Sequence, residues 1–170
     1  PWRDLSRDGR AVAMAMRIAS CDGATLRSER TRERLTDAAM ELVRRARAEG
    51  FQPSELQLDF DAPTSQLDGY RMLVRRVSDG LSPLPVTITA LPSWMSSRDF
   101  GDLVHSVPRF VLQVHSIDRS RLDGPEPSIC DADQAMRWVE RAAAFGVPFD
   151  VALPTYGYLV VRGASGHVVG

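Results

Sequence analysis

The alternation of β-rich runs with helical segments constrains the fold more than any other feature of this sequence. Five short runs rich in apolar residues occupy 11–18, 55–61, 86–91, 110–115 and 149–153. The segments between them repeat apolar residues with helical periodicity. This order predicts a parallel sheet joined by right-handed crossovers. Burial of such strands also explains why the runs are so apolar.

The predicted helices carry start and stop signals. The first ends at Gly50, the position where a glycine often follows a helix. The second begins near Ser65, which forms an S-x-x-D capping box with Asp68. The fourth ends at Gly146 and places Trp138 on its apolar stripe, which predicts that this tryptophan lies in the core.

Two architectures fit the predicted elements. An open doubly wound sheet is complete at 170 residues, whereas a full eight-unit barrel needs roughly 250. However, no glycine-rich turn follows a strand, and several strands end in polar residues. We therefore favour an α/β fold that is a partial or truncated (β/α) TIM-type barrel of about five strand–helix units, with the open doubly wound parallel sheet as the alternative. We expect residues 1–170 to form a single α/β domain, a fragment of a longer barrel, because the first residue is not Met.

Composition excludes several classes of chemistry and partner. All 21 Lys and Arg residues are Arg, which rules out Schiff-base lysine chemistry and the phosphate-binding P-loop. The net charge of −1 gives no field that would recruit nucleic acid. No apolar run approaches the roughly 20 residues that span a bilayer. We expect no nucleic-acid partner, no membrane contact by this domain and no cofactor.

The two cysteines, Cys21 and Cys130, are too few and too far apart to form a metal cluster. We expect isolated thiols, with a disulfide between them as the alternative.

The run 55–61 carries the strongest chemical signal. Gln57, Asp59 and Asp61 share one face of a strand, because side chains alternate. In a barrel this polar set would point toward the mouth. Two neighbouring carboxylates repel, which favours one protonated and one ionised group, as acid–base chemistry needs. The structural alternative is that Asp61 caps the loop while Asp59 pairs with an arginine such as Arg17.

Further candidates lie at other strand ends. Gln113 and His115 share a face, and His115 is suited to acid–base chemistry or to holding a carboxylate. Arg17 is suited to binding a carboxylate of the protein or of a ligand. Trp94 and Tyr156 follow strands, where aromatic rings can stack on sugars. For His115 and both aromatics the alternative is a purely structural role.

Other motifs are missing from the sequence. It contains no G-x-S-x-G, C-x-x-C or H-E-x-x-H pattern. We predict no metal site. Asp59, Asp61 and His115 form the one set whose ligand chemistry would allow a metal as an alternative.

Four phrases together resemble a known family. They are Leu-Asp-Phe-Asp-Ala-Pro-Thr at 58–64, Ile-Thr-Ala-Leu-Pro-Ser-Trp at 88–94, Val-Leu-Gln-Val-His-Ser at 111–116 and Val-Ala-Leu-Pro-Thr-Tyr-Gly-Tyr at 151–158. In this order they resemble the bacterial family called domain of unknown function 3142, over about 11–158. The resemblance implies a fold similar to glycoside-hydrolase TIM barrels and a location in the bacterial cell envelope or outside the cell. It implies no particular activity.

A weaker resemblance is to chitinase-like barrels, in which one strand ends in D-x-x-D-x-D-x-E. If Asp59 and Asp61 match the D-x-D, the acid position falls on Pro63, which cannot transfer a proton. Moving the match by two residues puts Asp61 in the acid position, but Gln57 then replaces an aspartate. Both alignments break the pattern, so we do not expect a chitinase mechanism.

These observations favour a carbohydrate-active, glycoside-hydrolase-like domain. Asp61 is the predicted proton donor, and Asp59 is predicted to orient or stabilise. The predicted ligand contacts are Arg17, Gln57, Trp94, Gln113, His115 and Tyr156. The alternative is a non-catalytic domain of the bacterial envelope that binds glycans or serves as a scaffold. Either domain would take a carbohydrate or another small-molecule ligand.

Overall fold

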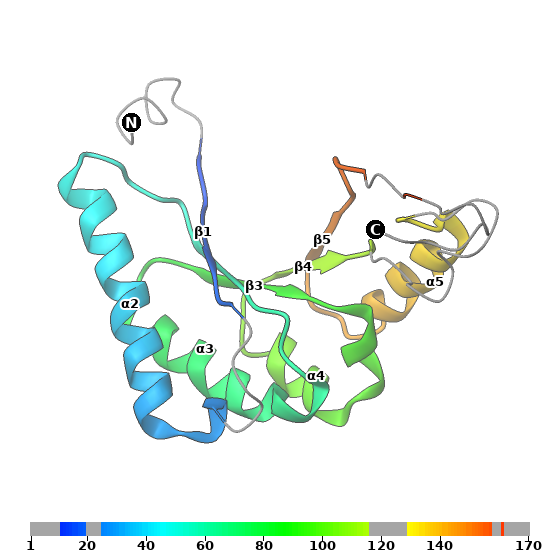
Figure 1. Cartoon of the computed structure of the whole chain (residues 1–170), viewed down its shortest axis with the longest axis horizontal. Coiled ribbons are helices and arrows are strands. Elements are labelled where there is room, and N and C mark those ends of the chain that lie inside the picture. The colour runs from blue at the N-terminus through cyan, green and yellow to red at the C-terminus, as the bar shows by residue number, and fades with distance from the viewer. Residues whose placement is uncertain (1–10, 20–24, 116–128, 158–160, 162–170) are drawn as a thin grey trace.

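Strands and helices alternate along the chain in this computed structural model, which describes residues 11–19, 25–115, 129–157 and 161 (Figure 1). The strands are β1 (Met14–Arg17), β2 (Leu56–Asp59), β3 (Val86–Ala90), β4 (Phe110–Gln113) and β5 (Phe149–Ala152). The α-helices are α2 (Glu29–Ala48), α3 (Leu67–Leu81), α4 (Arg98–Val104) and α5 (Ala132–Ala143). Three 3₁₀ turns are η1 (Thr25–Arg27), η2 (Thr64–Gln66) and η3 (Pro92–Ser96).

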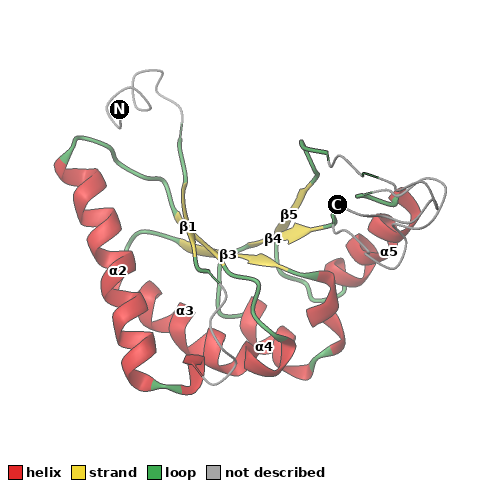
Figure 2. Ribbon diagram, in the orientation of Figure 1, coloured by secondary structure: helices red, strands yellow, loops and turns green. Residues whose placement is uncertain are grey.

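The strand order identifies the type of α/β fold. The five strands pair in parallel in the order β1-β2-β3-β4-β5, without a reversal. Right-handed crossovers between sequential strands carry every helix to the same face of the sheet. Figures 1 and 2 show α3 and α4 below the sheet and α2 at its left, and no helix of the described residues lies on the opposite face. A doubly wound sheet would reverse its strand order and carry helices on both faces. The predicted α/β fold is confirmed, and its described strands form an open sheet with the strand order of a partial barrel.

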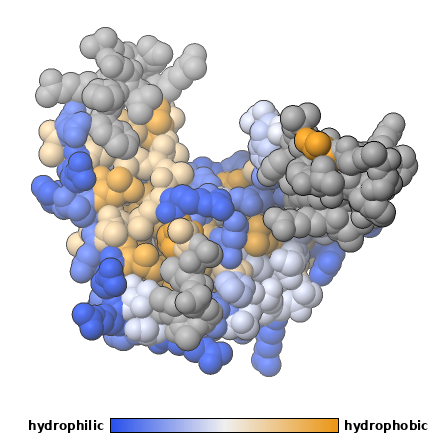
Figure 3. All heavy atoms as spheres, in the orientation of Figure 1, coloured by the Kyte–Doolittle hydropathy of each residue, from blue (hydrophilic) through white to orange (hydrophobic). Residues whose placement is uncertain are grey.

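The face without helices is hollowed. Figure 3 shows a notch in the molecular surface, between the part that carries β1 and the part that carries β5. The sheet forms the floor of this notch. On this face Gln57, Asp59 and Gln113 are partly exposed, whereas Thr87 and Thr89 of the central strand are buried.

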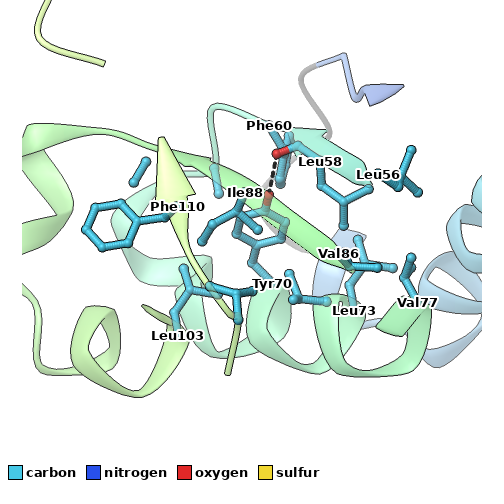
Figure 4. Close-up of a cluster of buried hydrophobic side chains, with 14 of the residues drawn as sticks. Leu56, Leu58, Phe60, Tyr70, Leu73, Val77, Val86, Ile88, Leu103 and Phe110 are labelled. Carbon is cyan, nitrogen blue, oxygen red and sulfur yellow. Dashed lines mark hydrogen bonds between the residues drawn. The ribbon is translucent and has the colours of Figure 1, made fainter. Parts of the chain in front are cut away.

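A continuous apolar core fills the space between sheet and helices. From β2, Leu56 and Leu58 are at most 1% exposed, and Phe60 just beyond the strand is equally buried. They pack with residues of β3, β4, α3 and α4, as Figure 4 shows. The Tyr70 hydroxyl of α3 donates a hydrogen bond to the backbone oxygen of Leu58 (3.1 Å). Burying each large apolar side chain stabilises the fold by about 1.5–3 kcal/mol, so the helix-facing residues fix the strands in place.

Helix ends follow the sequence signals with one exception. Gly50 and Gly146 have positive φ angles of 85° and 70°, as predicted for residues that follow helices. The predicted capping box of Ser65 and Asp68 is wrong. The turn η2 occupies Thr64–Gln66, so α3 begins at Leu67, beyond Ser65, and its N-cap makes no side-chain cap bond.

Of the two cysteines, Cys130 is partly buried and packs against the core. Cys21 lies outside the described residues, so the state of the two thiols stays a prediction. Within the ranges that the structure describes, no helix has the length and apolar character required to cross a membrane.

Candidate functional site

Arg17 joins the two carboxylates that the sequence singles out. It lies beside Asp59 in the β1–β2 register. Its Nη1 donates to Asp59 Oδ2 and its Nη2 donates to Asp61 Oδ2, each at 2.7 Å. The hydrogen bond and charge of Asp59, followed by the charge of Asp61, raise the pKa of Arg17. The structure therefore contains the Arg17–Asp59 pair that the structural alternative named, and Arg17 also binds Asp61.

Asp59 receives donors from two further strands. Thr89 of β3 donates its hydroxyl to Asp59 Oδ1 at 2.8 Å. Gln113 of β4 points its amide to the same oxygen at 3.5 Å, a weak contact. Side chains from β1, β2, β3 and β4 thus meet at one carboxylate, and they fix its orientation.

Thr89 is a site residue that the sequence reasoning missed. All five residues of β3 are buried, as in a strand whose side chains all belong to the core. The available signal was the alternation of Thr87 and Thr89 with apolar residues, which puts both hydroxyls on the open face. Gln57, partly buried on β2, lies on this face as well and pairs in register with Thr87.

His115 and Tyr156 form a second group. The Tyr156 hydroxyl and His115 Nδ1 share a hydrogen bond of 2.9 Å, and the rings meet edge to face with centroids 5.5 Å apart. His115 follows β4 and Tyr156 follows β5, so the strand ends bring together residues 41 apart in sequence. His115 also lines a cavity of about 200 Å³ together with Leu91, Pro92, Ser93 and Trp138.

The stacking role predicted for Trp94 is wrong. Trp94 is 1% exposed and its indole N–H donates to the Ala62 backbone oxygen at 2.9 Å. It packs edge to face against Tyr70 with centroids 6.1 Å apart. The turn η3 carries the chain away from the open face after β3, so Trp94 joins the core and cannot contact a ligand. Trp138 packs against the core as predicted, but it remains partly exposed at the cavity.

The alternative of a metal site finds no support in the described residues. No three His, Cys, Asp or Glu side chains among them are grouped closely enough to hold a metal ion. Asp59 and Asp61 face Arg17, whereas His115 contacts Tyr156.

A second arginine cluster lies at the opposite ends of the strands. Arg109, just before β4, donates through Nη2 to Glu55 Oε1 at 2.8 Å and through Nη1 to Asp150. Glu55 precedes β2 and Asp150 lies in β5. In (β/α) barrels the chemistry lies at the carboxyl ends of the strands, and the amino ends contribute stability. The Arg17 cluster is therefore the candidate site.

Comparisons with known proteins agree with this fold. The structure is similar to the crystal structure of the spore cortex-lytic enzyme SleL from Bacillus megaterium QM B1551, with a TM-score of 0.67 and 11% sequence identity. The match covers 88% of this chain and 37% of that chain, so this chain spans well under half of the enzyme's length. At this identity the likeness shows the fold alone. A search of curated proteins found no match.

The sequence itself matches the family described as Domain of unknown function (DUF3142) over residues 8–170. The resemblance of the four sequence phrases is thereby confirmed. The chain belongs to the DUF3142 family.

Proposed function

We propose that the open face binds carbohydrate and that the protein hydrolyses glycosidic bonds there. The observation that carries this proposal is the convergence of Arg17, Thr89 and Gln113, from β1, β3 and β4, onto the carboxylate of Asp59 in β2. A carboxylate cluster at the carboxyl ends of barrel strands has the position and chemistry of a glycosidase site.

The two carboxylates differ in ways that suit two roles. The Asp59 side chain is 19% exposed and is held by several donors, so it is suited to stabilising positive charge on a sugar ring. The Asp61 side chain is 47% exposed. Among the described residues, Arg17 is its one hydrogen-bond donor. Asp61 is therefore the proposed proton donor.

Proton donation by Asp61 requires that Arg17 move. The Arg17 side chain is 60% exposed, and exposed ion pairs contribute only about 0–1 kcal/mol. A ligand that draws the guanidinium away can thus separate it from Asp61 at little cost.

The remaining polar and aromatic residues of this face suit a sugar ligand. Gln57 and Gln113 offer both donors and acceptors for hydroxyl groups. His115 adds a ring nitrogen, and Tyr156 adds an aromatic ring that is 47% exposed. The protein of similar structure is a spore cortex-lytic enzyme. Together with the envelope location that the family resemblance implies, this similarity favours a bacterial wall glycan as the ligand.

A cleavage assay tests the proposal. The full-length natural protein is incubated with fragments of bacterial peptidoglycan and exopolysaccharide, and released reducing ends are measured. Asp61→Asn should lower the rate by about 10²–10⁴-fold, because general acid catalysis contributes that much. Asp59→Asn should lower it substantially as well. Asp150→Asn is the matched control, because it also removes an exposed carboxylate paired with an arginine, but at the other strand ends. Equal rates in Asp61→Asn and the parent would contradict the proposal.

Non-catalytic glycan binding is the second candidate, and one observation favours it. Arg17 forms an ion pair with Asp61, the proposed proton donor, and so balances the charge of its carboxylate. In this case calorimetry would detect glycan binding by the parent, Asp61→Asn would bind with similar affinity, and neither protein would release reducing ends.

A further inference from the structure

The cavity beside His115 is lined by both apolar and polar side chains, and none of them belongs to the Arg17 cluster. Leu91 and Pro92 supply apolar walls from the end of β3 and the start of η3. Trp138 of α5 supplies a partly exposed indole, and Ser93 a hydroxyl. The volume of about 200 Å³ is below the range of about 300–1,000 Å³ for drug-sized ligands, so the cavity suits one ring of a larger molecule.

His115 is held in a defined orientation at this cavity. Its Nδ1 is engaged by the Tyr156 hydroxyl at 2.9 Å, which leaves Nε2 as the ring nitrogen for a ligand. An aromatic face, apolar walls and a few fixed polar groups match the two sides of a sugar ring, one rich in C–H bonds and one rich in hydroxyls.

We propose that this cavity is a second sugar subsite, with Trp138 as the stacking platform and His115 and Ser93 as hydrogen-bonding groups. The inference rests on the proposed carbohydrate function and specifies its ligand further. β3 separates β2 from β4, which places the strands of Asp59 and His115 about 10 Å apart. A ligand that occupies both sites must therefore be an oligosaccharide that runs across the strand ends.

Fluorine NMR of the full-length protein labelled with 5-fluorotryptophan tests the subsite. The probes are glycan strands of two and six sugar units prepared from bacterial peptidoglycan, and tryptophan-to-phenylalanine variants assign the resonances. The six-unit strand should shift the Trp138 resonance and leave that of the buried Trp94 unchanged.

Affinities measured by calorimetry give the second readout. The six-unit strand should bind the parent about tenfold more tightly than the two-unit strand, because an aromatic platform contributes on that order. Trp138→Leu, which keeps an apolar side chain but removes the aromatic face, should abolish this advantage. Met136→Ala is the matched control, because Met136 lies on the same helix and is 59% exposed but does not line the cavity.

The outcomes separate the subsite from the hydrolytic function. Cleavage or binding of the six-unit strand with a static Trp138 resonance and unchanged affinity in Trp138→Leu would overturn the subsite and leave the proposed function standing. A Trp138 shift with the expected length dependence but without cleavage would support the subsite and overturn hydrolysis. Absence of binding by both strands would overturn both.

Discussion

Two arginine clusters occupy opposite ends of the same open face. Each places one arginine between two carboxylates, and each rests on a threonine of β3. Thr89 donates to Asp59 at one end, and Thr87 donates to Glu55 at 3.4 Å at the other. They differ in depth, because the arginine side chain is 60% exposed for Arg17 but 37% exposed for Arg109.

The difference in depth indicates different roles for the two clusters. We call the Arg109 cluster, formed by Glu55, Arg109 and Asp150, a brace, because it connects strands, and the Arg17 cluster the candidate site. The Arg109 cluster joins residues at the amino ends of β2, β4 and β5, and its Glu55 side chain is only 10% exposed. The Glu55–Arg109 pair is largely enclosed, whereas Asp150 remains 63% exposed at the rim of the cluster. The Arg17 cluster has the same components, but its arginine and Asp61 are open to exchange partners. The contrast therefore lies between the enclosed Glu55–Arg109 pair, which is suited to stability, and the open Arg17–Asp61 pair, which can exchange partners.

The largest expected effect on folding comes from removing Arg109, with Arg17 as the comparison. Arg109→Met should lower the free energy of unfolding by about 2 kcal/mol, because Glu55 loses its cation while it remains buried. Arg17→Met should lower it by less than about 1 kcal/mol, because water can solvate Asp61. Urea unfolding of both variants measures the two values. A larger loss for Arg17→Met would break the distinction between brace and site.

A smaller effect concerns the support beneath the site. Burial raises the pKa of Tyr70, and the charges of Asp59 and Asp61 act in the same direction, so its hydroxyl remains a neutral donor to Leu58. Tyr70→Phe removes this bond next to Asp59 and should lower the free energy of unfolding by about 1 kcal/mol. Tyr156→Phe makes the same chemical change at an exposed position and should have almost no effect on stability. Thermal unfolding of the two variants tests this contrast, and equal losses would contradict it.

The smallest expected effect is the response to salt. At about 1 M salt the screening length falls to about 3 Å, so exposed charges interact less. The stability difference between the parent and Arg17→Met should shrink by a few tenths of a kcal/mol, and the Arg109→Met difference should change less. Urea unfolding at low and high salt would show this, and a stronger salt response of the Arg109 cluster would reverse our assignment of the enclosed and open clusters.

Most of the fold and the centre of the candidate site could be predicted from sequence, because strand alternation is a local rule. It put Gln57 and Asp59 on the open face of β2, and the structural alternative named Arg17 as the partner of Asp59. The rule ends with the strand, and Trp94 lies four residues beyond the end of β3, where η3 turns it into the core.

Other features depend on contacts between segments that are distant in sequence. Trp138 packs on the core, as its helical stripe predicts, but its exposed edge depends on where η3 and His115 lie. The Arg109 cluster joins residues 54 and 41 positions apart. No periodic pattern within one segment indicates such a pairing, so these features require the three-dimensional structure.

Along β2, core residues alternate with residues of the open face, so the open face can be changed without altering the core. Leu56 and Leu58 belong to the core, whereas Gln57 and Asp59 do not contribute to it. Alternate positions can therefore be randomised in a library while the helix-facing positions keep the scaffold intact. Substitutions at Gln57 and Asp59 would change the chemistry of this face without redesigning the packing, provided that Arg109 is left in place.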